Sequence, residues 1–133
     1  MAVILLGNEH IWKLPFCRLE FVAILEKMLS FAKLQTIEVY LVSDTTIAFF
    51  NLHYMNCLGI TNVLSFPMDD EDFAGSIILS VDAVCRESLL YRQPILDYCL
   101  SLLSHGIAHI AGYTHGVEMD KFCSNLLLPF KLA

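Results

Sequence analysis

Three of the five histidines in this 133-residue chain lie within one short apolar stretch, from His105 to His115. His105 and His109 are four residues apart, so both side chains lie on one face of a predicted helix and can reach one ion. Gly112 permits a sharp, left-handed end of that helix, and His115 follows soon after it. Three imidazole nitrogens and one water molecule form the open arrangement of a catalytic zinc site. The spacing therefore predicts a metal centre at the end of a helix.

The spacing H-x-x-x-H-x-x-G-x-x-H also occurs in one group of zinc proteases. In zinc proteases a glutamate directly after the first histidine acts as the general base. Gly106 occupies this position here, so a peptidase mechanism with that base is excluded. We expect one zinc ion, although imidazole ligands suit zinc, copper, nickel and iron alike and the physiological metal stays open.

No other residue stands out as the general base of a hydrolytic reaction. The segment from Asp69 to Asp72 forms an acidic loop, and a run of charges usually faces water. Glu118 follows the third histidine closely, but a solvated helix position is the better interpretation. His10 and His53 lie alone in the sequence, and we interpret them as ordinary residues. Apart from a zinc-bound water, the catalytic group is therefore unassigned.

The composition limits the classes of protein to which the chain can belong. The net charge of −6 excludes a basic surface over the whole domain, so any binding of nucleic acid must use a local cleft or a metal. Five scattered cysteines without a CxxC pair predict buried or half-buried thiols in a reducing cytosol. We expect no secretory signal and no membrane span, because the N-terminal apolar run lacks a basic flank and the longest apolar stretch contains Asp97 and two histidines.

Strands and helices alternate along the chain around the histidine segment. Apolar alternation and β-branched residues predict strands at residues 2–6, 36–42, 61–67 and 76–81. Helical spacing and capping residues predict helices that begin at Pro15, at Ser43 or Asp44, at Asp82, at Pro94 and at Val117. We therefore predict a single α+β domain over residues 1–133, with a mixed four-stranded sheet packed with about five helices and the metal site at the end of a core helix.

Two motifs make the sequence resemble the YbeY family. The segment from His105 to His115 is similar to the family signature H-G-x-x-H-x-x-G-Y-x-H, and "TNVLSFP" at Thr61 to Pro67 resembles a strand motif of the family. The segment "GSIILS" at Gly75 to Ser80 lies where the family has a glycine-led strand. YbeY proteins are bacterial metal-dependent endoribonucleases that take part in ribosomal RNA maturation and ribosome quality control.

The resemblance implies a cytoplasmic bacterial nuclease whose zinc ion is held by the three histidines. It implies a cleft for single-stranded ribosomal RNA, 16S rRNA included, between the metal helix and the sheet, with ribosomal proteins as further partners. The cleft candidates are residues of the strand motif and of the glycine-led strand: Ser65, Phe66, Pro67 and Ser76.

The chain departs from the family pattern at three positions. Met55 follows Tyr54 where the family has an arginine, whose planar guanidinium would bind a phosphate. Ser76 and Thr114 each stand where the family commonly has an aspartate, which can support metal-binding histidines through hydrogen bonds. Two alternatives therefore stay open beside the ribonuclease: a weakened or non-catalytic member that binds metal and a ribosomal or protein partner, and a metal hydrolase of another substrate.

Overall fold

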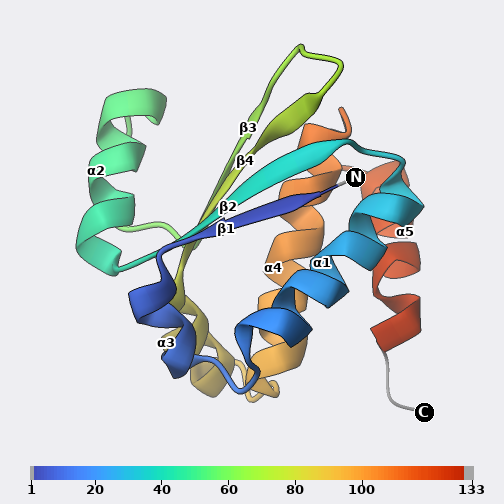
Figure 1. Ribbon diagram of the computed structural model, residues 1–133. Coiled ribbons are helices and arrows are strands. Elements are labelled where there is room, and N and C mark those ends of the chain that lie inside the picture. The colour runs from blue at the N-terminus through green and yellow to red at the C-terminus, as the bar shows by residue number, and fades with distance from the viewer. Residues whose placement is uncertain (1, 131–133) are drawn as a thin grey trace.

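The computed structural model describes residues 2–130, which form a four-stranded mixed sheet with helices on both faces (Figure 1). The strands are β1 (Val3–Leu6), β2 (Thr36–Val42), β3 (Val63–Pro67) and β4 (Phe73–Ser80). Their order across the sheet is β1-β2-β4-β3, with β1, β2 and β4 parallel and β3 antiparallel to β4. The predicted mixed sheet is confirmed, and β3 forms one of its edges.

Five α-helices accompany this sheet within the described residues: α1 (Arg18–Ala32), α2 (Asp44–Met55), α3 (Val81–Leu90), α4 (Ile95–Ile110) and α5 (Val117–Leu127). Two short 3-10 helices, η1 (Asn8–Lys13) and η2 (Leu128–Phe130), complete the secondary structure. Helices α1, α4 and α5 lie on one side of the sheet, and α2 lies on the other (Figure 1). The predicted α+β class is confirmed. No helix between residues 2 and 130 has the length and apolar character to cross a membrane.

Strand alternation places the side chains of β2 in two different apolar clusters. Ile37, Val39 and Leu41 of β2 point into the larger cluster, which also contains side chains of α1 and α4. Val42 and Tyr40 belong to a smaller cluster that includes side chains of α2, β3 and β4. Since successive side chains of a strand point to opposite faces, β2, β3 and β4 each contribute side chains to both clusters.

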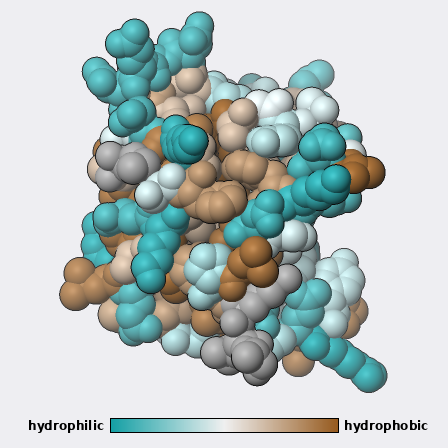
Figure 2. All heavy atoms as spheres, turned by 90° about the vertical axis from the view of Figure 1, so that its right-hand side faces the viewer, coloured by the Kyte–Doolittle hydropathy of each residue, from teal (hydrophilic) through white to brown (hydrophobic). Residues whose placement is uncertain are grey.

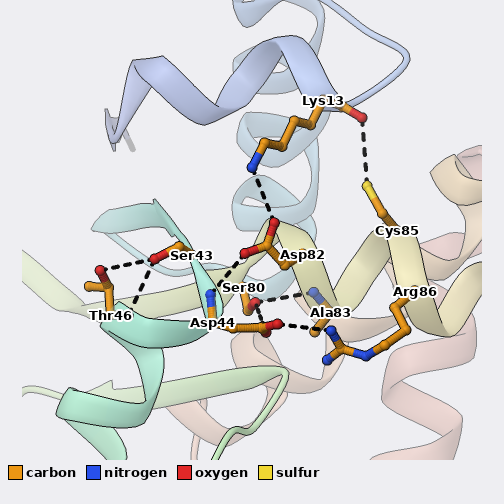
Figure 3. A network of polar contacts seen from close by, with 9 residues as sticks. All are labelled: Lys13, Ser43, Asp44, Thr46, Ser80, Asp82, Ala83, Cys85 and Arg86. Carbon is orange, nitrogen blue, oxygen red and sulfur yellow. Dashed lines mark hydrogen bonds and ion pairs between the residues drawn. The ribbon is translucent and has the colours of Figure 1, made fainter.

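A network of polar contacts joins the start of α2 to α3 and η1 (Figure 3). The Asp82 carboxylate accepts hydrogen bonds from the backbone N–H of Asp44 at 3.0 Å and from Lys13 Nζ at 3.1 Å. The Asp44 carboxylate accepts from the Ser80 hydroxyl at 2.9 Å and from Arg86 at 2.8 Å. The network ties the first turn of α2 to the strand end from which α3 begins.

The N-terminal caps of α2 and α3 both lie in this network. Ser43 caps α2 as predicted, because its hydroxyl accepts from the Thr46 N–H at 3.3 Å. The prediction that Asp82 caps α3 is wrong: the Ser80 hydroxyl accepts from the Ala83 N–H at 3.1 Å. The Asp82 carboxylate instead binds the first N–H of α2, a contact between distant segments that local sequence does not reveal.

Strand β4 begins earlier than predicted, at Phe73 instead of Ser76. Residues 73–75 directly follow the acidic loop in the sequence. They form a strand because β4 pairs with β2 from Phe73, opposite Thr36, and with β3 as far as Gly75, opposite Pro67. This pairing supplies the backbone hydrogen bonds that the local composition does not predict.

The five cysteines are free thiols, but they are not uniformly buried. Cys17 and Cys57 are exposed, so the prediction of buried or half-buried thiols is wrong for these two. Cys99 is fully buried in the main core, and burial raises the pKa of its thiol to about 12. Cys99 therefore behaves as a small apolar side chain.

The side of the molecule that carries α5 shows apolar side chains in its centre and hydrophilic ones around them (Figure 2). Helices α1 and α5 are in contact, and the rings of Phe31 and Phe122 are 6.3 Å apart between their centroids. Phe31 is exposed, so the apolar contact between α1 and α5 extends to the molecular surface.

Candidate functional site

Helix α4 carries the first two histidines of the predicted site, one helical turn apart. Pro94 precedes the helix, and apolar residues bury one side of it against the sheet. His105 and His109 are half-buried at the opposite end of α4. Both side chains therefore leave the core on the helix face that looks toward β3, which α4 contacts.

The chain turns sharply after α4 and brings His115 back to its end. Gly112 has a backbone φ of +101°, a left-handed conformation that side chains rarely adopt. The Gly112 N–H donates to the carbonyl of His109 at 3.1 Å. After this turn the His115 ring lies 5.2 Å from the His109 ring between centroids, almost perpendicular to it. Gly112 thus allows the sharp turn after α4 that its position in the sequence predicts.

The three histidines line one pocket of about 450 Å³ between α4 and β3. Val63 and Ser65 of β3 form part of its wall, and Tyr98 and Ser101 line it from the first half of α4. Asn62, directly before β3, completes the polar lining. The pocket thus combines three imidazoles with hydroxyl and amide groups.

Backbone carbonyls hold the orientation of two of the imidazoles. His105 Nδ1 lies 3.0 Å from the carbonyl oxygen of Ser101, and His109 Nδ1 lies 3.2 Å from that of Tyr113. A carbonyl oxygen can only accept, so each Nδ1 carries the proton and each Nε2 keeps its lone pair. This is the arrangement in which proteins present histidines to a metal ion.

The donor set fits a divalent metal chemically, because three imidazole side chains line one pocket. Among the side chains that the structure describes, no group of three histidine, cysteine or carboxylate side chains is already gathered closely enough to hold an ion. His115 is the exposed member of the three and lies on the turn after α4. The three rings therefore share a pocket without forming a closed set of ligands.

A hydrogen-bonded group behind the pocket wall contains a carboxylate that sequence patterns did not single out. The Tyr98 hydroxyl donates to Glu87 Oε1 at 2.5 Å, and Asn62 Nδ2 donates to the same oxygen at 3.0 Å. Burial, then the hydrogen bond to Glu87 and its negative charge, raises the pKa of Tyr98 to about 12. Glu87 on α3 thus holds two side chains that line the histidine pocket.

Three polar lining residues, Asn62, Tyr98 and Ser101, were not predicted from the sequence. Tyr98, Ser101, His105 and His109 follow one another at spacings of three or four residues on α4, so they share one helix face. The same spacing is typical of a helix face packed in a core, so it does not by itself indicate a pocket. Asn62 is the second residue of the TNVLSFP motif and directly precedes β3, but its residue type alone does not indicate that it lines a pocket.

The predicted cleft residues divide between the two faces of the sheet. Ser65 lines the histidine pocket, whereas Phe66 and Ser76 line a different pocket on the α2 side. Pro67 is exposed at the end of β3. Alternation along the strand is the reason, since neighbouring residues Ser65 and Phe66 must point to opposite faces.

The other sequence candidates lie apart from the histidine pocket. The side chains of the acidic loop, 69–72, are exposed, as are those of Glu118 and Thr114. His53 packs against the Phe49 ring on α2, with 4.0 Å between ring centroids. Met55 ends α2 and is half exposed. None of these residues lines the pocket as the structure describes it.

Comparison with known proteins gives a consistent result. Residues 13–123 match the family model described as Endoribonuclease YbeY. A Lawsonia intracellularis protein named Endoribonuclease YbeY is 99% identical over the full length of both chains. A Nitratidesulfovibrio vulgaris protein of the same name is 37% identical over 84% of this chain and 83% of its own.

The fold also matches a solved structure. The solution structure of TM1509 from Thermotoga maritima superposes with a TM-score of 0.62 and 23% sequence identity, covering 96% of this chain and 91% of that one. This likeness supports the fold. The family-model match and the sequence relatives carry the assignment: the chain belongs to the YbeY endoribonuclease family.

Proposed function

We propose that this protein is a metal-dependent endoribonuclease that cleaves single-stranded RNA in the maturation of ribosomal RNA. The observation that carries the proposal is one pocket lined by His105, His109 and His115. Family membership and relatives named as endoribonucleases support the reaction class. We place the reaction in the bacterial cytoplasm, with ribosomal RNA as substrate and ribosomal proteins as neighbours.

The three histidines would hold a zinc ion through imidazole nitrogens. A bound zinc ion supplies Lewis acidity and positive charge for phosphodiester hydrolysis. This charge is needed here because the whole chain has a net charge of −6 and repels a polyanion at long range. A local cation within a pocket overcomes that repulsion where the reaction takes place.

The remaining lining residues bind and orient the phosphodiester. The Ser65 hydroxyl lies on the β3 wall of the pocket and is a donor suited to a phosphate oxygen. The pKa of Tyr98 is raised to about 12, so its hydroxyl keeps its proton even in moderately alkaline solution. Glu87 accepts from both Tyr98 and Asn62, so its negative charge is partly neutralised before it can oppose a phosphate.

The test is cleavage of a single-stranded RNA by the wild type and by His109→Ala, purified identically. His109→Ala removes one imidazole and serves as the control for contaminating nucleases. Cleavage by the wild type alone supports the proposal, and a duplex of the same sequence tests strand specificity. Equal cleavage by both proteins, or none by either, contradicts it.

A weakened family member is the second candidate, and Met55 is the observation that favours it. Met55 is half exposed at the end of α2 and has no charge with which to bind a phosphate. In that case the wild type binds RNA and zinc but cleaves slowly. The rate relative to that of the Met55→Arg variant separates the two candidates.

A further inference from the structure

A second pocket, of about 330 Å³, lies on the face of the sheet that α2 covers. Its wall is mainly aromatic: Phe50 and Tyr54 from α2, Tyr40 from β2 and Phe66 from β3. No lysine or arginine is among the described residues that line it. The pocket is therefore suited to a flat, apolar group and unsuited to a phosphate.

The rings of this aromatic pocket present a face to a ligand. Phe50 and Tyr54 are stacked, with centroids 5.6 Å apart and planes inclined by 20°. The Phe66 ring stands edge-on to Tyr54, with centroids 5.8 Å apart. Tyr54 is 65% exposed, so its ring is accessible from solvent. An unpaired nucleobase stacks on such rings in proteins that bind single strands.

The polar end of the aromatic pocket has a defined hydrogen-bonding character. The Tyr40 hydroxyl donates to Glu38 Oε2 at 3.1 Å, and the Ser76 hydroxyl donates to the same oxygen at 3.2 Å. Burial and the hydrogen bond to Glu38 raise the pKa of Tyr40, so this hydroxyl keeps its proton. Since both protons are used by Glu38, the two hydroxyl oxygens offer only lone pairs to a ligand.

Acceptors at the end of an aromatic pocket select a base by its donors. Cytosine and adenine present an exocyclic amino group, and guanine presents an amino group and a ring N–H. Uracil presents carbonyl oxygens beside its one ring N–H, and these would face the lone pairs of Tyr40 and Ser76. The hydrogen-bond pattern therefore favours an amino-bearing base over uracil.

The edge strand β3 connects the aromatic pocket to the histidine pocket. Ser65 lines the histidine pocket and Phe66, the next residue, lines the aromatic pocket. No described strand pairs with the outer side of β3, so a chain of RNA can cross this edge. A strand that crosses there has a phosphodiester on the Ser65 side and a base on the Phe66 side.

We propose that the aromatic pocket binds one amino-bearing base of the single-stranded RNA whose phosphodiester lies at the histidine pocket. The proposal rests on the proposed function and adds a specificity site to it. Tyr54 stacks on the base, Phe66 contacts the edge of the base, and Tyr40 and Ser76 accept from its amino group. The carboxylate of Glu38 acts through those two hydroxyls and is a positioning residue.

The test is binding of short fluorescent cytidine and uridine oligonucleotides with zinc supplied, on a backbone that is resistant to cleavage. These two bases differ in their donors and are matched in ring size. The wild type should bind the cytidine oligonucleotide about fivefold more tightly, as expected for one net hydrogen bond. Tyr54→Ala should weaken binding of both about tenfold through the loss of stacking.

Two further variants distinguish recognition of the base from a general loss of structure or RNA binding. Glu38→Ala frees both hydroxyls to rotate and donate, so the preference for cytidine should disappear while binding remains. Phe49→Ala removes an exposed ring from the same helix that does not line the aromatic pocket, and it should bind as the wild type does. Unchanged melting temperatures show that each variant is folded.

The base site is overturned if Tyr54→Ala and Phe49→Ala bind both oligonucleotides equally well, or if the wild type binds neither. It is also overturned if an arginine-rich peptide, and not RNA, binds in a Tyr54-dependent way, since the pocket then serves a protein partner. Failure of the proposed function would give a different experimental result. The wild type would then show base-dependent binding without cleavage of any single-stranded RNA when zinc is supplied.

Discussion

Gly106 of α4 lies directly against Ile77 of β4, and a Cβ atom at Gly106 would be only 3.1 Å from Ile77 Cδ1. Ile77 is fully buried, so its side chain has little room to move. The position at which zinc proteases carry their general base is therefore a helix–sheet contact here. The same glycine that excludes a peptidase mechanism lets the histidine helix approach the sheet.

Gly106→Ala should destabilise the protein despite the better helix propensity of alanine. Crowding in a packed core costs about 1–3 kcal/mol, and the propensity gain of ~1 kcal/mol offsets only part of that. We expect a net loss of about 1 kcal/mol in the free energy of unfolding, measured in urea. In an Ile77→Val background, which lacks the Cδ1 atom, the same change should cost less. A stabilising effect in the wild-type background would contradict this, because it would show that the Ile77 side chain shifts to accommodate the added methyl group.

The histidine site could be predicted from the sequence because the residues that form it are close together in the chain. His105 and His109 share a helix face through their spacing alone, and Gly112 supplies the turn that brings His115 back. The polar partners of the site are not local. Glu87 and Tyr98 lie on different helices and meet only when α3 and α4 pack together.

The predicted cleft residues lie on two faces of the sheet, and the sequence could not show this for a different reason. Ser65 and Phe66 are neighbours in the sequence, and the period of a strand places them on opposite faces. Deciding which face meets α4 requires knowing where α4 and α2 lie. The pairing of Glu38 with Ser76 is likewise a contact across two strands, and no local pattern predicts it.

His109→Ala should lose zinc binding, because two imidazoles alone leave the coordination incomplete. Zinc content after dialysis should fall from about one ion per chain to well below it, and added zinc should no longer raise the melting temperature. His53→Ala is the matched control, since His53 lies on α2 against Phe49. Full zinc content and an unchanged melting temperature in His109→Ala would refute the three-histidine assignment.

Glu87→Gln should lower the pKa of Tyr98 toward its ordinary value of 10.0. The substitution removes the negative charge but keeps a hydrogen-bonding oxygen, so only part of the shift disappears and the part due to burial stays. Tyrosinate absorbance during a pH titration of the folded protein measures this change. If the tyrosine titration curves of the two proteins coincide, Glu87 does not influence Tyr98.

The same pair predicts how stability changes at alkaline pH. The pKa of Tyr98 is higher in the folded state, so its contribution is complete below the ordinary value of 10.0 and is lost as pH rises toward about 12. Glu87→Gln should shift this loss to lower pH. Unfolding free energies measured across that range check the direction.

Asp82→Asn should destabilise the protein at neutral pH and have little effect in acid. The pKa of Asp82 is lowered, chiefly by the hydrogen bond from the Asp44 backbone and further by Lys13, against desolvation that raises it. A lowered pKa contributes stability above the ordinary value of 3.8, and this contribution is lost as pH falls below it. Urea unfolding at neutral and acid pH measures the difference. Asp69→Asn, in the exposed acidic loop, should show no such pH dependence.

Met55→Arg should strengthen RNA binding by adding a guanidinium at the end of α2, next to Tyr54. A hydrogen bond to a charged group contributes about 1.5–3 kcal/mol, which corresponds to at least about tenfold in affinity. One added phosphate contact should also steepen the dependence of log K on log salt by about 0.7 for a single strand. Binding of a labelled RNA at several salt concentrations measures both quantities.

Leu19→Arg is the matched control for this gain, since Leu19 is 81% exposed on α1, a helix on the other face of the sheet. It adds the same charge to an acidic protein, so it reports the general electrostatic effect alone. A gain specific to Met55→Arg, with faster RNA cleavage, means that the natural protein is a weakened nuclease. Equal gains in both variants mean that position 55 makes no phosphate contact. In that case the methionine does not limit catalysis, and the RNA reaches the histidine pocket without a phosphate contact at position 55.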